Sequence, residues 1–405
     1  MFVLHCSAGM DKKSLLYTSF DVVPSKKGAA VHIEQFALSI AQAFGDLKLL
    51  TVAPPGGAAD RAGWTGIQHV EMPAPGDDLI ARVMNFRRLL ISWLLKARQN
   101  DEFFEIVHFR SPFEGLPFVQ DGFRDSRLIF EVNGLPSIEL KYRYPKVADD
   151  EVLLEKLIAQ EDLCLEAAQT VVTTCKVTKD YLIGRGVRED KIRVIPNGVQ
   201  LELFPFREYR GGSKETDFKL LYVGTLSGWQ GVDTSIRALA LLQEEFPARL
   251  TIIGPASAER VGQLRDFAHT LGVADRVNIL PAVEQCALIS FMHAADVILA
   301  PLTANDRNLV QGCCPLKVLE AMASGTPVLA SDMPVVSEIT DDTCLLVKPG
   351  SAGSLKDGIV QIRNSPAMAA ELSRRARLRI EHNYTWARAG LSLVDCYNAL
   401  LCLPA

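Results

Sequence analysis

The sequence predicts an α/β protein made of two doubly wound, Rossmann-like domains that face a central cleft. Short apolar runs alternate with segments of helical periodicity along the whole chain, and this alternation is typical of parallel sheets covered by helices on both faces. About ten strands are expected, more than one sheet of this kind usually holds. The chain has 405 residues, enough for two domains of ordinary size.

The expected strands are short and rich in aliphatic residues. They cover residues 47–52, 106–109, 128–132, 170–174, 193–195, 220–223, 250–253, 277–280, 297–300 and 328–330. Helical periodicity is found over residues 31–43, 81–98, 149–168 and 233–245. Residues 1–6 indicate an opening strand and not a signal peptide, because they lack a charged leader and a small-residue cleavage site.

The break between the two domains is expected at Pro196-Asn197-Gly198, a turn signal directly after a strand. We therefore predict an N-terminal domain over residues 1–198 and a C-terminal domain over residues 199–383. Ligands of doubly wound sheets bind outside the carboxyl ends of the strands. The residues at those strand ends, in the cleft between the domains, are therefore the candidates for function.

Composition excludes some classes of protein. The net charge of −5 and pI of about 5.9 disfavour a nucleic-acid-binding protein, which normally has a basic surface. No apolar run approaches the length of a membrane span. The nine cysteines are scattered and form no CxxC pair, so we expect free thiols in a reducing cytoplasm and no metal site.

The most informative segment covers residues 315–330, which predict a helix followed at once by a buried strand. Pro315 suits a first helical position, and Gly325 can close the helix in a left-handed conformation. Lys317 and Glu320 are three residues apart and share one face. The helix start therefore offers a cation, a carboxylate and free N–H groups to a nucleotide diphosphate and its ribose. An ordinary helix–strand unit with a surface Lys and Glu explains the spacing equally well.

Two glycine-containing turns could also approach a phosphate closely. Lys26, Lys27 and Gly28 precede the helix expected near residue 31, and small residues with free N–H groups suit an anion. Gly224-Thr225 directly follow a strand, and Gln230 lies just before the next helix. A solvated loop explains the first turn as well, and a tight turn explains the second.

Polar residues follow two strands of the predicted N-terminal sheet. His108 and Arg110 come at the end of one strand and Asn133-Gly134 at the end of another, where side chains are expected to reach the cleft. A structural role for the histidine is the alternative. Glu114 and Glu139 lie nearby in the sequence, but nothing marks either as a general base.

The segment from Ala81 to Arg98 mixes many apolar residues with five cations. A basic amphipathic helix of this kind can lie on an anionic membrane surface. The alternative is a helix packed on its own sheet with the cations solvated. The apolar residues are too many for a single membrane-facing stripe, which favours the alternative.

Taken together, these motifs resemble the retaining glycosyltransferases of family 4, which have the GT-B architecture. The resemblance covers nearly the whole length of the chain. Its motifs lie at residues 170–174, 181–182, 186–187, 191–199, 222–224, 295–297 and 315–330, with Glu338. The tail, residues 384–405, is similar to the family's final helix, which crosses back to the N-terminal domain.

The resemblance implies that a sugar passes from a nucleotide-diphosphate donor to an acceptor hydroxyl with its anomeric configuration kept. It implies no metal and no cofactor, with the donor bound by the C-terminal domain and the acceptor by the N-terminal domain. The acceptor class stays open between saccharides, lipid-linked intermediates and small metabolites.

The same resemblance assigns roles to individual residues. Glu320 would bind the ribose hydroxyls, and the amides around Cys314, Pro315 and Leu316 would meet the donor phosphates or sugar. Gly28 would approach the diphosphate from the N-terminal domain, and His108 or Arg110 would lie near the donor sugar.

Three departures from the family pattern concern the groups that handle the donor. Thr225 replaces an arginine, Gln230 replaces a lysine, and Gly312 replaces the first glutamate, eight residues before Glu320. We expect Lys317 to supply the missing charge, with Lys26, Lys27 and Arg307 as further candidates. Two alternatives remain open. One is a catalytically weakened scaffold that binds or regulates another transferase, and the other is a nucleotide-sugar epimerase.

Overall fold

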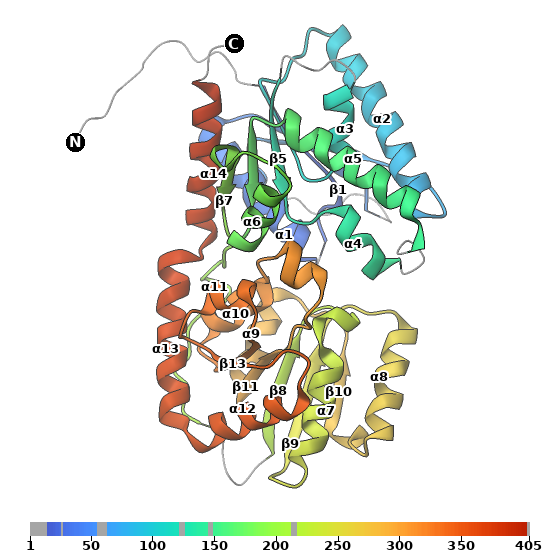
Figure 1. The fold of residues 1–405 in the computed structure, drawn as a ribbon. Coiled ribbons are helices and arrows are strands. Elements are labelled where there is room, and N and C mark those ends of the chain that lie inside the picture. The colour runs from blue at the N-terminus through green and yellow to red at the C-terminus, as the bar shows by residue number, and fades with distance from the viewer. Residues whose placement is uncertain are drawn as a thin grey trace, which may run out of the picture.

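The structure is a computed structural model that describes residues 14–25, 27–54, 63–120, 126–144, 149–211 and 217–402. It contains two parallel sheets, one above the other (Figure 1). The predicted two-domain, Rossmann-like fold is therefore confirmed. The strand predicted at residues 1–6 and the candidate Lys26 lie outside the described residues.

The first sheet has seven strands in the order β3-β2-β1-β4-β5-β6-β7. These strands are β1 Leu15–Val22, β2 Leu47–Val52, β3 Ile67–Met72, β4 Ile106–Phe109, β5 Arg127–Val132, β6 Thr170–Thr173 and β7 Ile192–Val194. The helices of this part are α1 Gly28–Phe44, α2 Leu79–Gln99, α3 Pro112–Gln120, α4 Pro136–Arg143, α5 Glu151–Ala167 and α6 Lys176–Gly184. The strand order changes direction between β1 and β4, the switch point at which doubly wound sheets bind ligands.

The second sheet has six strands in the order β10-β9-β8-β11-β12-β13. These are β8 Phe218–Val223, β9 Ala248–Ile253, β10 Val277–Leu280, β11 Val297–Ala300, β12 Val328–Ser331 and β13 Leu345–Val347. Its helices are α7 Val232–Leu242, α8 Ala258–Thr270, α9 Gln285–Ala294, α10 Leu316–Ser324, α11 Pro334–Thr340, α12 Ala352–Asn364 and α13 Pro366–Asn383. Four short helical turns lie between these elements: η2 Glu189–Lys191, η3 Gly228–Gln230, η4 Ala274–Arg276 and η5 Arg307–Gln311. The predicted boundary at residue 198 falls between β7 and β8.

The last helix, α14 Trp386–Leu401, returns to the N-terminal sheet and packs along α1. Together α13 and α14 form one long column that runs beside both sheets (Figure 1). The crossing point is fixed by backbone contacts, since Val199 N donates to Tyr384 O at 2.8 Å and Val199 pairs with Thr385. Trp386 and Tyr397 of α14 are buried in the same core cluster as Phe36 of α1.

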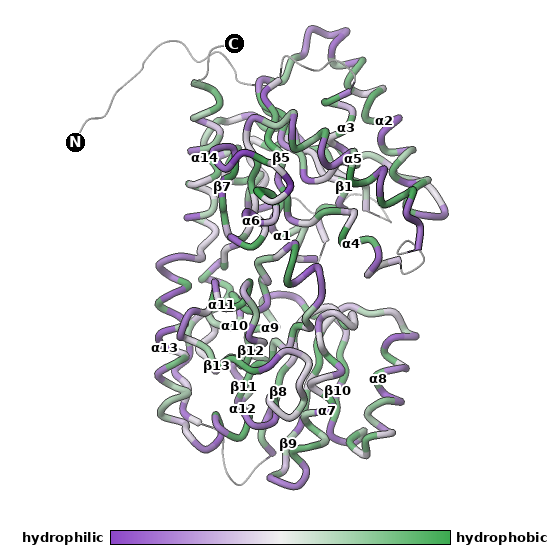
Figure 2. The backbone as a smooth tube through the Cα atoms, in the orientation of Figure 1, coloured by the Kyte–Doolittle hydropathy of each residue, from purple (hydrophilic) through white to green (hydrophobic). Residues whose placement is uncertain are grey.

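Each sheet is buried on both faces, and hydrophobic residues are concentrated along the strands (Figure 2). Three of the observed strands, β1, β3 and β13, were not predicted from the sequence. β1 and β3 carry polar residues that interrupt an apolar run, and β13 has only three residues. The helices agree in position, although α1 already begins at Gly28 and Pro315 is the residue before α10, not its first. No helix among the described residues is long and apolar enough to cross a membrane.

Candidate functional site

The start of α10 faces the N-terminal domain. Pro315 precedes the helix, and no side chain caps its first backbone N–H groups. At the other end Gly325 has φ of 88°, the left-handed conformation predicted from the sequence. The carbonyl of Cys314, just before the helix, accepts a hydrogen bond of 2.7 Å from Asn197 Nδ2. The helix start is therefore held by a residue that follows the N-terminal sheet.

Lys317 in the first turn of α10 lies among the residues that follow β8. Its ammonium donates to Gln230 Oε1 at 2.5 Å and lies 4.8 Å from the centre of the Tyr222 ring. A Cβ atom on Gly224 would come within 3.3 Å of Lys317 Cδ. The structure thus brings together Lys317, Gln230 and Gly224, three residues that the sequence marked separately. Burial lowers the pKa of Lys317 to about 7.

Glu320 lies one turn further along α10. Its Oε1 accepts a long hydrogen bond of 3.4 Å from Gln285 Nε2. Burial raises the pKa of Glu320 to about 7. Lys317 and Glu320 therefore both change charge near neutral pH, which is a common property of groups that meet a ligand.

Thr225 has an unpaired hydroxyl at this site. Its Oγ1 is buried and has no hydrogen-bond partner among the described residues, while its carbonyl accepts from Tyr222 Oη at 2.8 Å. Buried polar atoms are rarely left unpaired. This one lies at the position where the resembling family carries an arginine.

The first residue of α1 meets the first residue of α10. A Cβ atom on Gly28 would lie 3.0 Å from Leu316 Cδ1. No side chain caps α1 either, since Lys27 at its N-cap makes no capping bond. Two uncapped helix N-termini, one from each domain, therefore converge, and both favour negative charge.

Arg307 of η5, the other candidate cation, is paired across the two domains. Its Nε donates to Glu139 Oε1 of α4 at 3.0 Å, and its guanidinium lies 4.2 Å from the centre of the Trp229 ring. Gln311 Nε2 also donates to Glu139 Oε1, at 3.1 Å. Glu139, to which the sequence gave no role, thus places a carboxylate of the N-terminal domain beside the segment leading to Gly312.

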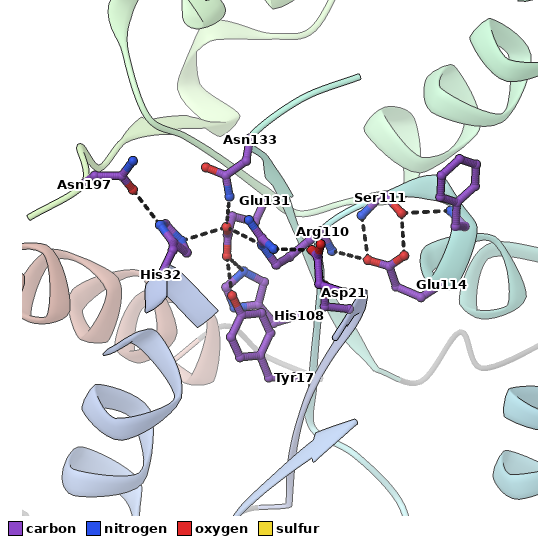
Figure 3. A network of polar contacts seen from close by, with 12 residues as sticks. Tyr17, Asp21, His32, His108, Arg110, Ser111, Glu114, Glu131, Asn133 and Asn197 are labelled. Carbon is purple, nitrogen blue, oxygen red and sulfur yellow. Dashed lines mark hydrogen bonds and ion pairs between the residues drawn. The ribbon is translucent and has the colours of Figure 1, made fainter. Parts of the chain in front are cut away.

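A buried network of polar side chains lies at the ends of β1, β4 and β5 (Figure 3). Its centre is the carboxylate of Glu131, which is fully buried. Tyr17 Oη donates to Glu131 Oε2 at 2.8 Å, and Arg110 Nε donates to Glu131 Oε1 at 2.9 Å. Asn133 Nδ2 donates to the same carboxylate, and Arg110 Nη1 also pairs with Asp21 Oδ2 at 2.7 Å.

Glu131 stays ionised in this environment. Burial alone raises the pKa of a carboxyl group, but electrostatic interactions with His32 and Arg110 and hydrogen bonding by His108 and His32 hold the pKa of Glu131 well below its usual range. The sequence analysis missed this residue. Its only signal was a single carboxylate inside the otherwise apolar run of β5.

His108 and Arg110 are placed by this network. His108 lies within β4, not after it, and is fully buried, with Nε2 at 3.1 Å from Glu131 Oε2 and Nδ1 at 3.0 Å from Tyr397 Oη. The expectation that its side chain reaches the cleft is therefore corrected, because Tyr397 of α14 covers it. Arg110 is 7% exposed and is held by two carboxylates, those of Glu131 and Asp21.

The fold and this site define the chain as a GT-B-type protein with two uncapped helix N-termini and a lysine between its domains. Two family profiles match it, "Glycosyltransferase Family 4" over residues 26–203 and "Glycosyl transferases group 1" over residues 207–379. The chain belongs to the glycosyltransferases of family 4.

Curated relatives agree with this family. The chain is 26% identical over 324 residues to D-inositol 3-phosphate glycosyltransferase of Pseudarthrobacter chlorophenolicus, covering 75% of this chain and 73% of the relative. It is 30% identical to the enzyme of the same description from Nocardiopsis dassonvillei, covering 60% of this chain and 58% of the relative. The match therefore spans less than two thirds of this second relative.

Solved structures share the fold over almost their whole length. Sucrose-phosphate synthase from Thermosynechococcus elongatus superposes with a TM-score of 0.78 at 20% identity, covering 96% of this chain and 99% of that one. HepE of Anabaena in complex with UDP-glucose gives a TM-score of 0.71 at 16% identity, covering 95% and 100%.

We predict that Glu131→Gln lowers the free energy of unfolding by about 3–5 kcal/mol, because it leaves buried cations without their carboxylate. Urea unfolding followed by circular dichroism measures the change. Asp21→Asn is the matched control, since Asp21 is 39% exposed and should contribute no more than about 1 kcal/mol. Equal stability of the Glu131→Gln variant and the wild type would show that the carboxylate is not essential to the network.

Proposed function

We propose that this chain transfers a sugar from a nucleotide-diphosphate donor to an acceptor hydroxyl, with retention of configuration and without a metal ion. The observation that supports this proposal most directly is the contact of 2.5 Å between Lys317 Nζ and the side chain of Gln230. Gln230 occupies the position at which the family carries a lysine. Lys317 therefore brings a positive charge to the place where the family's own lysine is missing.

The chemistry follows from charge that develops on the leaving diphosphate. As the bond from the sugar to the diphosphate breaks, the ammonium of Lys317 and the N–H groups at the starts of α1 and α10 stabilise the growing negative charge. The acceptor hydroxyl attacks the same face of the sugar, and a leaving phosphate oxygen takes its proton. Glu320, one turn from Lys317, accepts hydrogen bonds from the ribose hydroxyls.

The acceptor is proposed to bind on the N-terminal side. The named relatives are D-inositol 3-phosphate glycosyltransferases, which supports a hydroxylated acceptor and a role in glycoconjugate biosynthesis. A screen of UDP-, GDP- and ADP-sugars with polyol, saccharide and lipid-linked acceptors identifies the substrates. Nucleotide binding with no turnover in any combination would instead support the non-catalytic scaffold, and isomerisation of the donor alone would support the epimerase.

We predict that Lys317→Met lowers kcat about 100-fold or more, whereas the affinity for the nucleoside diphosphate falls much less. The reason is that the interaction strengthens only as charge develops on the leaving group. Steady-state kinetics and calorimetry measure the two quantities. Lys219→Met, on an exposed position of β8, is the control of equal charge change. Wild-type turnover of the Lys317→Met variant would rule out this lysine as the replacement cation.

Nucleoside-diphosphate affinity should be greatest near pH 7. Burial lowers the pKa of Lys317 to about 7 in the free protein, so this side chain loses its charge as the pH rises above 7 and the affinity falls. Burial raises the pKa of Glu320 to about 7, so protonation below pH 7 removes its ability to accept from ribose.

Because a bound anion favours the charged amine, binding at pH 8 should take up close to one proton per nucleotide. Calorimetry in two buffers of different ionisation enthalpy measures this uptake. The Lys317→Met variant should lose the uptake and keep only the acid limb of the profile. Binding by the wild type at pH 8 with no proton uptake would contradict the assignment.

We also propose that α2 contacts an anionic membrane surface. Its core face buries Phe86, Leu90 and Leu94, which accounts for many of the apolar residues between 81 and 98. Yet Ile80, Met84 and Leu95 remain 54%, 59% and 51% exposed, and their spacing places them on one face of the helix. The cations Arg88 and Lys96 are exposed on the same helix, a combination suited to anionic lipid.

A hollow of about 330 Å³ beside Met84 supports this surface. It is lined by Met84, Arg87, Arg88, Ile91, Leu116, Pro117 and Gln120.

We predict that the double substitution Met84→Asp with Leu95→Asp reduces partitioning to phosphatidylcholine–phosphatidylglycerol vesicles about tenfold or more. Sedimentation with vesicles measures it, and Leu391→Asp, at a 68% exposed position of α14, is the control. Equal sedimentation of all three proteins would exclude this surface.

A further inference from the structure

His32 of α1 lies between the buried Glu131 network and the C-terminal domain. It is 3% exposed and packs against Phe36 and Trp386, with ring centres 4.1 Å and 5.5 Å away. Its Nδ1 lies 2.6 Å from Asn197 Oδ1, and its Nε2 lies 2.8 Å from Glu131 Oε1 (Figure 3). Both ring nitrogens therefore face an oxygen atom.

The hydrogen bonds fix the protonation of this ring. Asn197 Nδ2 donates to the Cys314 carbonyl at 2.7 Å, so it is the amide oxygen of Asn197 that faces His32. An amide oxygen and a carboxylate can only accept. Nδ1 must therefore carry the hydrogen, and it donates to Asn197 Oδ1.

The other side of the His32 ring faces the Glu131 network. The groups near it are Glu131 of β5, His108 of β4, Arg110 directly after β4, and the neutral Asn197. Burial lowers the pKa of His108, which is therefore neutral and accepts from Tyr397 Oη. Arg110 pairs with both carboxylates of this network, those of Glu131 and Asp21. Buried charges are tolerated when they are paired in this way.

We propose that His32 is a positioning residue for the transfer reaction. Acting through Asn197, it holds the turn before α10 and so places Lys317 against the donor diphosphate. The path runs from α1 of the N-terminal domain to Asn197, which follows β7, and then to Cys314, three residues before Lys317. Without the donor at Nδ1, Asn197 Oδ1 is left buried and unpaired, and the side chain is free to turn away from Cys314. This role rests on the function proposed above.

The test compares His32→Phe, which keeps an aromatic ring and removes the Nδ1 donor, with Tyr397→Phe, which removes one hydroxyl at the far end of the same network. His32→Phe should lower kcat about tenfold with little change in the acceptor KM, and it should speed amide hydrogen exchange over residues 313–318. Tyr397→Phe should match the wild type in both measurements, whatever its loss of thermal stability. Unchanged exchange and kcat in His32→Phe would overturn the proposal.

A double-mutant cycle tests the path through Asn197. Asn197→Ala leaves the buried charges in place and should reproduce the kinetic and exchange effects, so it also serves if His32→Phe does not fold. If His32 acts through Asn197, the variant carrying both substitutions is no slower than the slower single variant. Reductions that multiply in the double variant would show independent roles and overturn the proposal.

Nitrogen NMR of histidine-labelled protein tests the protonation directly. Nδ1 of His32, assigned from the His32→Phe spectrum, should show the shift of a protonated nitrogen. An unprotonated Nδ1 would overturn the assignment. The exchange and NMR measurements need no substrate, so they test the positioning role even if the chain proves to transfer no sugar.

Discussion

The N-terminal domain depends on one buried carboxylate. Glu131 is fully buried, and taking a carboxylate out of water costs several kcal/mol unless partners replace the lost hydration. Here the partners come from different parts of the domain, namely Tyr17 of β1, Arg110 directly after β4 and His32 of α1. Each of these elements is thereby fixed relative to β5. The position of α1 follows, and with it the position of Gly28 against α10.

The start of α10, where we propose that the donor binds, carries its positive charge at a different sequence position from the family's lysine but at the same place in space. The family's lysine position holds Gln230, which is neutral, and Lys317 reaches that glutamine from another element 87 residues away. A lysine at the start of a helix adds its own charge to that of the helix N-terminus. The burial that lowers its pKa also weakens solvent screening, so the diphosphate that we propose binds here would meet a stronger field than it would at the surface.

The sequence predicted the fold well because alternating strands and helices leave a strong periodic signal. It missed β1, since Ser19 and Asp21 interrupt the apolar run, and these residues are polar because they serve the Glu131 network. The predicted contact residues Lys317, Gln230 and Gly224 do lie together, but their pairing depends on packing that no local pattern reveals. His108 was misplaced for a similar reason, because the helix that covers it, α14, lies almost three hundred residues further along the chain.

The contacts between the two domains differ in the free energy needed to break them. The Asn197–Cys314 bond is buried and lies close in the chain to the crossing at Val199 and Thr385. The Lys141–Asp306 pair joins exposed side chains, which usually contribute less than about 1 kcal/mol. A rotation about the crossing would separate distant contacts before near ones, so the Lys141–Asp306 pair and the neighbouring Arg307–Glu139 pair would break while Asn197 stayed bonded. The turn before α10 would then keep its place during such a rotation, because the Asn197–Cys314 hydrogen bond that holds it lies beside the crossing at Val199 and Thr385.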